Sequence, residues 1–458
     1  MNHTPSMQLT PSSPCTWTSP LLALLSQLLI PNNDEEQAPR RGNPGKVSCE
    51  HLWLAFLQGI LMQVEHVADI WNILLWQHLG PFAPVNLSYH AVRQRLLAEG
   101  TQGLETLLQL INRGLRERRA LCCALPEQLA AFARQVVALD ECTLESLRRL
   151  CEDLRQDPLG SPRLLAGKIA GLFDLRTQQW LRLQWREESW ANGKVGVLLL
   201  LEGLPAGSLI LADLGYFSFA WFDYLTAQGY YWVSRWREGT TYEIVHTFYQ
   251  NGELLDALVW LGASRSDRAA HLVRLVQFRS RGQLSRYLSN VLDPQMLPLH
   301  EIAELYARSF DIELAFKLLK TELGLRLWWT ATPVLLEQQL IGALILAQLL
   351  HALQLEIAAQ AGVGVFDVSL HRLLKLLQQA NGVTGPLVPQ IVEHGRTWGI
   401  IRPNSRLVIV APHIPLRLMT PAPVQVPLWR PPRYAGRKSR SRKPRPAHFP
   451  RFLTRLLI

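Results

Sequence analysis

QVVALDECT, residues 135–143, is the stretch that decides the fold of this 458-residue chain. Four apolar residues, two of them β-branched, lead to Asp140, which is the pattern of a buried strand that ends on a carboxylate. Further strand patterns follow at 168–176, 180–185, 195–201, 208–213 and 230–236. A helical pattern at 219–227 separates the last two strands. Strand, helix and strand in succession predict an α/β core with a mixed sheet flanked by helices.

The chain before this core has helical patterns. Apolar residues recur at three- and four-residue spacing in 51–77 and 92–110. We therefore predict a helical N-terminal domain over 49–134, preceded by a mobile leader, 1–48, that is rich in Pro, Ser, Thr and Asn. The arginines of this domain could follow a DNA backbone or lie on solvated helix faces. They are Arg93, Arg95, Arg113, Arg116, Arg118 and Arg119.

The core itself is predicted in two parts, 135–237 and 298–400. Between them, 238–297 has strand-like segments around an Asn251–Gly252 hairpin signal, which indicates a β-rich insertion. The second part has long helical patterns at 300–323 and 335–360. The final segment, 401–458, is rich in proline, and we expect an extension with little packing.

Positive charge is concentrated in that final segment. It holds 13 of the 47 Lys and Arg residues and none of the 37 Asp and Glu residues, so the rest of the chain is close to neutral. A cationic tail on a near-neutral body favours a polyanionic partner, most simply nucleic acid, because neutralising phosphates releases counterions. A tail that only improves solubility is the alternative.

Cysteine usage and hydropathy bear on the compartment. The six cysteines form no CxxC pair and have no histidine partners at zinc-ligand spacing, which favours a reduced, cytosolic compartment. The apolar run 21–30 has no basic region before it and makes a poor signal peptide. The most apolar helical pattern, 340–353, is interrupted by Gln348 and is shorter than the roughly 20 residues of a membrane span. We expect a core helix there and no membrane partner.

Two aspartates stand at the ends of predicted strands, Asp140 after 136–139 and Asp213 after 209–212. Open α/β sheets place their chemistry at strand ends. Two or three carboxylates together make a hard oxygen site suited to Mg²⁺ or Mn²⁺. Each aspartate taken alone is more simply a turn former or a helix N-cap. Asp174 is the nearest rival of Asp140 for the first position.

A third segment, 306–325, reads YARSFDIELAFKLLKTELGL. At 3.6 residues per turn, one helix face carries Tyr306, Glu313, Lys317 and Lys320. The other face is apolar and consists of Ile312, Ala315, Phe316 and Leu319. A carboxylate to hold metal, followed by lysines to hold phosphate, suits phosphodiester chemistry. The alternative is a solvated amphipathic helix in which Glu313 and Lys317 form an i,i+4 pair.

Together these segments resemble the insertion-sequence transposases of the family-four type. The final catalytic helix of that family carries a Tyr-x2-Arg-x3-Glu-x6-Lys signature, whose spacing Tyr306, Glu313 and Lys320 match. The stretch DLGYFSFAWFDYL from Asp213 is similar to the family's D-x-G-Y motif, and LDECTLESL around Asp140 is similar to its first motif. The resemblance covers about 135–360 and implies an RNase H-like catalytic fold.

The resemblance implies a DNA transposase that cuts at the terminal inverted repeats of its element and joins the ends to target DNA. Asp140, Asp213 and Glu313 would form the catalytic triad and bind two Mg²⁺ ions, with Mn²⁺ as a substitute. The implied partners are transposon ends, target DNA and a second copy of the chain in a synaptic complex, in the bacterial cytoplasm at the nucleoid. The residues implied in DNA binding are Tyr306, Arg308, Lys317 and Lys320.

The departure from the signature lies at Ser309, where the family has arginine. Arg308 is adjacent, but it points about 100° away on a helix. This departure keeps open a transposase-derived protein that binds DNA without cutting it. A different metal-dependent nuclease on the same RNase H-like core is the second alternative.

Tryptophans are frequent in and around the predicted core. We interpret them as core residues, and stacking on unpaired bases is the alternative. They are Trp185, Trp190, Trp232, Trp236, Trp328 and Trp329.

Overall fold

The computed structural model describes residues 47–122, 129–144, 168–186, 197–263, 267–330, 332–379, 387–404, 406, 409–423, 425–434 and 455–456. The chain divides into two compact units. One consists of the residues up to Gly114 together with Glu322–Arg402, and the other of Leu115–Thr321 together with the residues from Pro403 onward. The expected leader, 1–48, lies outside the described residues except for its last two positions.

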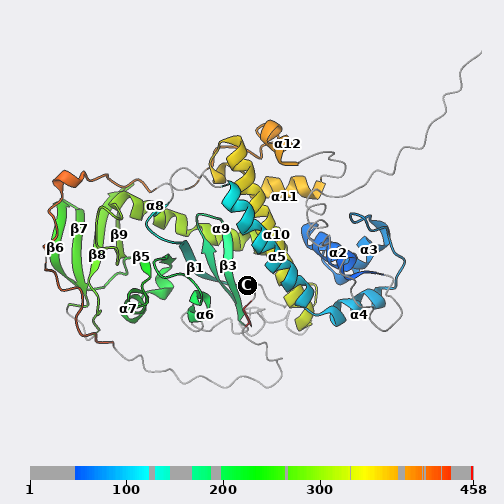
Figure 1. The fold of residues 1–458 in the computed structure, drawn as a ribbon, viewed down its shortest axis with the longest axis horizontal. Helices are drawn as coiled ribbons and strands as arrows, with labels where there is room; N and C mark the ends of the chain where they lie inside the picture. Colours follow the sequence, from blue (N-terminus) through cyan, green and yellow to red (C-terminus); the bar gives the residue numbers. More distant parts are fainter. Residues whose placement is uncertain are drawn as a thin grey trace, which may run out of the picture. The chain divides into compact units, whose positions relative to one another are not determined.

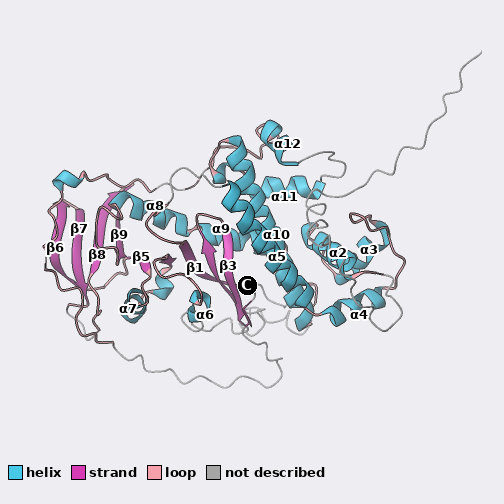
Figure 2. Ribbon diagram, viewed as in Figure 1, coloured by secondary structure: helices cyan, strands magenta, loops and turns pink. Residues whose placement is uncertain are grey.

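The first unit is helical (Figures 1 and 2). Its helices are α2 (Cys49–Leu61), α3 (Val67–Trp76), α4 (Tyr89–Glu99), the start of α5 (Gln102–Cys122), α10 (Pro333–Ala361), α11 (Leu370–Gln379) and α12 (Leu387–His394). Helix α10 packs against α2, α4, α11 and α12. A Cβ on Gly342 of α10 would lie 2.5 Å from a side-chain carbon of Ile60 on α2. Glycine at this position therefore lets the two helices approach closely.

Helix α10 is the central core helix of this unit. Among the described residues, it has the length and apolar composition of a membrane-spanning helix, and 78% of its most apolar window is buried inside the protein. Its buried polar side chains have partners within the unit. Gln338 donates to the carbonyl oxygens of Leu96 and Gly100, and Gln348 donates to the side chain of Asn112. The expectation of a core helix at 340–353 is confirmed.

The buried imidazole of His351 on α10 makes the stability of this unit depend on pH. Burial lowers the pKa of His351 to about 4. The neutral ring is thus favoured in the folded state, and its contribution is fully present above the unfolded pKa of about 6.5 and is lost as the pH falls through 4. Between pH 7 and 4 we expect the free energy of unfolding to fall by about 2–3 kcal/mol more in the unsubstituted protein than in His351→Met.

Urea unfolding at both pH values measures this difference. His394, whose side chain is half exposed, supplies the control variant His394→Gln. If His351→Met and the unsubstituted protein lost the same free energy of unfolding between pH 7 and 4, this imidazole would not be the cause of the acid sensitivity.

The second unit is built on one ten-stranded sheet with the order β10-β3-β2-β1-β4-β5-β9-β8-β7-β6. Its strands are β1 (Val136–Thr143), β2 (Lys168–Asp174), β3 (Gln179–Arg186), β4 (Leu209–Ala212), β5 (Tyr231–Arg235), β6 (Tyr242–Asn251), β7 (Leu254–Leu261), β8 (Val273–Ser280), β9 (Gln283–Ser289) and β10 (Arg455–Leu456). Strand β1 is parallel to β4 and β4 is parallel to β5, whereas the other pairs are antiparallel. The predicted mixed sheet flanked by helices is confirmed.

Helices cover both faces of this sheet (Figure 1). On one face lie α6 (Val197–Leu201) and α7 (Phe219–Ala227), and on the other lie α8 (Leu299–Ser309) and α9 (Asp311–Lys317). Val137 and Leu139 of β1 pack into the core that contains α6 and α7. Because side chains alternate along a strand, Ala138 and Asp140 face α8 and α9.

Two expected elements differ from those observed. The segment expected as a strand at 195–201 forms the helix α6, in which Val197, Leu200 and Leu201 are buried and the two leucines between them are exposed. This is helical spacing, which a short uninterrupted apolar run does not reveal. The single helix expected at 300–323 is divided, because α8 ends at Ser309, α9 begins at Asp311, and a π-helical turn, η5 (Leu318–Glu322), follows.

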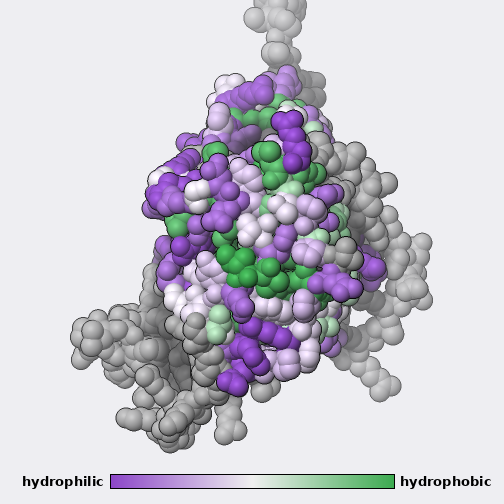
Figure 3. Space-filling view, turned by 90° about the vertical axis from the view of Figure 1, so that its left-hand side faces the viewer, coloured by the Kyte–Doolittle hydropathy of each residue, from purple (hydrophilic) through white to green (hydrophobic). Residues whose placement is uncertain are grey.

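Of the described residues of the C-terminal segment, 409–423 and 425–434 form a strap over the antiparallel end of the sheet (Figure 1). The backbone N–H group of Thr420 in the strap donates to Phe248 on β6, and that of Arg430 donates to Ala270 in the loop before β8. In the same loop, the N–H group of Leu272 donates to the backbone oxygen of Leu428 in the strap. A cavity of about 480 Å³ lies between the strap and the sheet and is lined by Phe248, Leu258 and several strap residues. Hydrophobic side chains gather among polar ones on this face (Figure 3). The backbone of these residues is hydrogen-bonded to the sheet, while most of their side chains are exposed, as expected for an extension with little packing.

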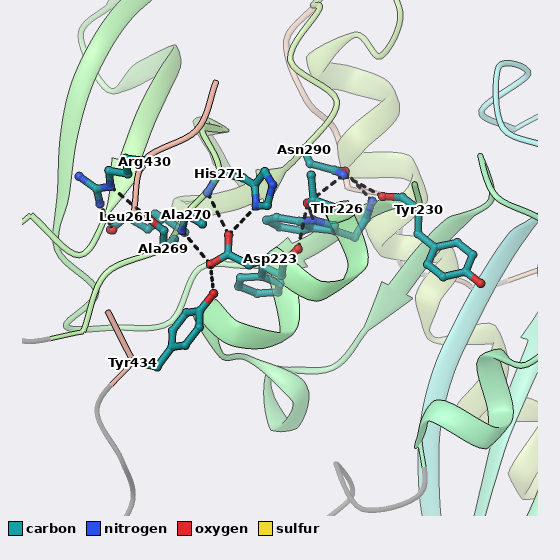
Figure 4. Close-up of polar contacts among 12 residues, drawn as sticks. Asp223, Thr226, Tyr230, Leu261, Ala269, Ala270, His271, Asn290, Arg430 and Tyr434 are labelled. Atoms are coloured by element: carbon teal, nitrogen blue, oxygen red, sulfur yellow. Dashed lines mark hydrogen bonds and ion pairs between the residues drawn. The ribbon is translucent and has the colours of Figure 1, made fainter. Parts of the chain in front are cut away.

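Asp223 on α7 fastens the end of the strap (Figure 4). One carboxylate oxygen accepts hydrogen bonds from the backbone N–H and the Nδ1 of His271, each at 2.9 Å. The other accepts from the backbone N–H of Ala270 and from the Tyr434 hydroxyl, each at 2.7 Å. The carboxylate is buried, so these four donors replace its hydration.

Removing this carboxylate is expected to destabilise the second unit strongly. Asp223→Ala leaves four donors without their acceptor and should lower the free energy of unfolding by about 3–5 kcal/mol. Tyr434→Phe removes one hydrogen bond from a partly exposed phenol and should cost about 1 kcal/mol. Urea denaturation measures both, with Tyr242→Phe on β6 as the control. Equal effects of the Asp223 and Tyr434 variants would contradict a shared acceptor.

Candidate active site

Strand register brings the two predicted aspartates together. Strands β1 and β4 pair in parallel from Val136 beside Leu209 to Leu139 beside Ala212. Asp140 follows Leu139 on β1, and Asp213 follows Ala212 just after the end of β4. Neighbouring strands lie about 4.8 Å apart. Ile210 packs into the core with α6 and α7, so alternation places Asp213 on the opposite face, as it does Asp140. Both carboxylates therefore stand on the face that α8 and α9 cover.

The helix that carries Glu313 is seated beside Asp140 by aromatic packing. Asp140 lies opposite Gly171 on β2. A Cβ on Gly171 would stand 2.3 Å from the Trp180 ring, so the indole occupies the space that a side chain would fill. The Trp180 ring lies 4.8 Å from the ring of Phe316 on α9. Glycine in β2 thus makes room for the contact that holds α9 over β1.

The apolar face expected for the helix segment is observed, whereas the polar face is observed only in part, because Tyr306 is buried on α8. Glu313 and Lys317 are exposed, and Lys320 is partly buried. The apolar residues of the opposite face are all buried, as predicted: Ile312, Ala315, Phe316 and Leu319.

The pKa values of Asp140 and Glu313 are affected by neighbouring carboxylates. Burial, with smaller contributions from the negative charges of Asp213 and Glu313, raises the pKa of Asp140 to about 7. The pKa of Glu313 is raised by burial and by the charge of Asp213. Three acidic groups that perturb one another in this way favour binding of a cation, because a cation lowers the energy of the ionised forms.

The donor set fits a divalent metal by its chemistry. Three carboxylates supply the hard oxygen atoms that Mg²⁺ and Mn²⁺ prefer. In the part of the chain that the structure describes, no group of three or more His, Cys, Asp or Glu side chains stands close enough to share an ion. Asp213 and Glu313 are exposed, so rotation of their side chains can bring their oxygen atoms closer to Asp140.

Tyr306 lies in an aromatic and cationic setting and is affected by the charge of Asp213. Its ring lies 4.9 Å from that of Tyr287 on β9, and Tyr287 stands opposite Arg235 on β5. Burial raises the pKa of Tyr306 to about 12, with the Arg235 charge opposing the shift and the Asp213 charge adding to it. The phenol therefore keeps its proton at neutral pH. Arg235, the last residue of β5, was not singled out from the sequence.

The remaining residues expected to bind DNA have distinct surroundings. The Lys320 ammonium group donates to the backbone oxygen of Thr143, the last residue of β1, at 2.9 Å. The Arg308 guanidinium donates to the Asp311 carboxylate and to the backbone oxygen of Leu175. The Ser309 hydroxyl donates to the backbone oxygen of Tyr306 at 2.6 Å, within α8.

Two further interpretations can be checked. Asp174, the rival of Asp140, is buried, and its carboxylate accepts hydrogen bonds from the backbone N–H groups of Arg176 and Thr177 in the turn between β2 and β3. It shapes that turn. Five of the tryptophans are buried, which confirms their interpretation as core residues, and Trp190 lies outside the described residues. The buried ones are Trp185, Trp232, Trp236, Trp328 and Trp329.

Residues 166–349 match the model of the family described as the transposase DDE domain. This part of the chain is therefore similar to a transposase DDE domain. The matched range contains Asp213 and Glu313 and begins after Asp140.

Among curated proteins, the chain is similar to transposase InsG for insertion sequence element IS4 from Escherichia coli strain K12. The two are 23% identical over 221 residues, which cover 44% of this chain and 48% of that protein. The chain thus spans about half the length of this relative. The insertion-sequence type that the three motifs predicted is confirmed.

Among solved structures, the chain is similar to the cryo-EM structure of the piggyBac transposase synaptic complex with hairpin DNA. The sequences are 11% identical, the TM-score is 0.39, and the alignment covers 85% of this chain and 82% of that one.

The crowding of carboxylates makes a prediction about stability. In metal-free protein at pH 8, Asp140→Asn removes one of three like charges and should raise the free energy of unfolding by roughly 1–3 kcal/mol. Urea unfolding in the presence of EDTA measures it, with Glu304→Gln on the exposed side of α8 as the control. A loss of stability in Asp140→Asn would contradict this prediction, because it would mean that positively charged side chains already neutralise this carboxylate.

Proposed function

We propose that this protein is a DNA transposase that cuts DNA at the terminal inverted repeats of its element and joins the ends to target DNA. The observation that carries the proposal is the parallel pairing of β1 with β4, which leads to Asp140 and Asp213 as neighbours, in a chain whose residues 166–349 match the transposase DDE domain. The effect of the Asp213 and Glu313 charges on the pKa of Asp140 supports a site that includes Glu313. Asp140, Asp213 and Glu313 are the proposed catalytic residues.

We propose further that β1 to β5 form an RNase H-like core and that β6 to β9 are an insertion. Three antiparallel strands followed by two parallel ones, in the order β3-β2-β1-β4-β5, support the first part. The four added strands lie in sequence between Asp213 and Glu313, and β9 hydrogen-bonds to β5. The insertion thus extends the core sheet beyond the site.

The proposed cofactor is a pair of Mg²⁺ ions, with Mn²⁺ as a substitute. Asp140, Asp213 and Glu313 would hold them. When bound, such ions activate an attacking water or 3′-hydroxyl and stabilise the leaving oxygen. Asp140 is half-buried on β1, whereas Asp213, just after β4, and Glu313, on α9, are exposed. We therefore propose that DNA approaches the site from the side of α9.

Two residues are proposed to contact the DNA strand directly. The protonated Tyr306 hydroxyl, beside Arg235, can donate to a phosphate oxygen, and the exposed Lys317 lies one turn after Glu313. Lys320 and Arg308 bond within the chain, and we propose that they hold this segment in place for DNA binding. The helices of the first unit, the basic segment 401–458 and a second copy of the chain are proposed to complete the synaptic complex at the nucleoid.

The proposal predicts metal-dependent cleavage that needs all three carboxylates. The purified protein is incubated with Mg²⁺ or Mn²⁺ and a DNA fragment that carries the inverted repeat flanking its gene. Each of Asp140→Ala, Asp213→Ala and Glu313→Ala should reduce the cleavage rate by at least about 1,000-fold, whereas the matched variant Glu304→Ala should cut normally. Gel analysis of end-labelled DNA measures cleavage.

A second candidate function is DNA binding without cutting, which Ser309 favours because it places a hydroxyl where the family signature has a guanidinium. The same assay separates the two functions. Binding of the repeat by the unsubstituted protein with no cleavage in either metal would support the second candidate and exclude the first. Cleavage that survives the triad substitutions would exclude this site.

A further inference from the structure

Asp311 lies between Tyr306 and Glu313 in sequence, at the first position of α9, and its side chain is fully buried. A buried carboxylate is costly unless it is paired and hydrogen-bonded. Its partners come from three separate segments, and they are Gln178, Arg308 and Arg406.

The first partner joins α9 to the sheet. Gln178 lies in the turn between β2 and β3, with a backbone φ of 53°, and is buried. Its side-chain amide donates to Asp311 at 2.9 Å and to the backbone oxygen of Leu175 at 2.9 Å. A non-glycine residue with positive φ is strained, so the bonds of this amide help to hold the turn in that conformation.

The two arginines neutralise Asp311 and bring in two more segments. Arg308, in the last turn of α8, donates to Asp311 at 2.8 Å and to the same Leu175 oxygen at 2.7 Å. Arg406, beyond the end of the first unit, forms an ion pair with the other Asp311 oxygen. At the break between α8 and α9, the Asp311 carboxylate is therefore bonded to the β2–β3 turn, to α8 and to the C-terminal segment.

We propose that Asp311 is a positioning residue for Glu313, which is two residues later on the same short helix. The bonds of Asp311 fix the start of α9, and the contact between Phe316 and Trp180 fixes its next turn against the sheet. Glu313 lies between these two attachments. Arg308 then serves as a structural partner of Asp311, and Arg406 couples the basic C-terminal segment to the site.

This inference rests on the proposed function, since it concerns a carboxylate proposed to bind metal. Asp311→Asn keeps the size of the side chain and its acceptor for Gln178, but it removes the charge that pairs with two arginines. Glu253→Gln is the matched control, because it removes a carboxylate from an exposed ion pair with Arg279 in the same unit. Arg406→Gln removes one partner from a more exposed position and serves if Asp311→Asn does not fold.

Two measurements are made on the full-length protein. Titration with Mn²⁺, followed by electron paramagnetic resonance of the free ion, should show affinity about 10-fold to 100-fold weaker in Asp311→Asn and Arg406→Gln than in the control. Hydrogen exchange in metal-free protein should show the amides of 311–317 exchanging roughly 10-fold faster, with β7 and β8 unchanged.

The outcomes distinguish the two proposals. Unchanged exchange at 311–317, or faster exchange with unchanged Mn²⁺ affinity, would overturn positioning and leave Asp311 with a purely structural role. If the unsubstituted protein neither binds Mn²⁺ nor cuts DNA, the proposed function fails, and the exchange result alone then decides whether Asp311 fixes the helix.

Discussion

Parallel pairing of β1 with β4 is the constraint on which the site depends. Once Leu139 stands beside Ala212, the next residues of both strands must be neighbours, and both are aspartates. Their charges repel, and burial makes the ionised form of Asp140 costlier still. Every other part of the site is arranged around this pair: Gly171 makes room for Trp180, Trp180 contacts Phe316, and α9 brings a third carboxylate to the same face. The fold thus concentrates negative charge where a chain selected only for stability would disperse it.

Much of this arrangement could be predicted from local sequence. The continuous apolar run before Asp140 predicted a buried strand, and the helical periodicity of 219–227 and of the apolar face of α9 predicted helices; all are observed. The spacing of Tyr306, Glu313 and Lys320 indicated the family that the comparison with known proteins supports. Each of these features depends on residues that are close together in the chain, so the local sequence is enough to predict it.

Features that depend on distant partners could not be predicted in this way. The run VLLLL at α6 is equally apolar as a strand or a helix, and only its packing on β2 and β3 decides which it is. Asp311 looks like an ordinary first-turn acid, because its partners at positions 178 and 406 are far away in sequence. Arg235 has no motif around it and gains its place beside Tyr306 from the pairing of β5 with β9. The association of α10 with α2 likewise joins segments about 280 residues apart.

The strap has a consequence for how this protein is made. Asp223 receives one of its four hydrogen bonds from Tyr434, which follows it by 211 residues. On the ribosome, α7 and its neighbouring strands emerge long before the strap, and domains begin to fold as they emerge. The carboxylate must therefore stay hydrated, or be held by His271 and Ala270 alone, while the rest of the chain is synthesised. A nascent chain that stops short of residue 434 can already contain Asp140, Asp213 and Glu313 and still lack the hydrogen bond that holds the strap to Asp223.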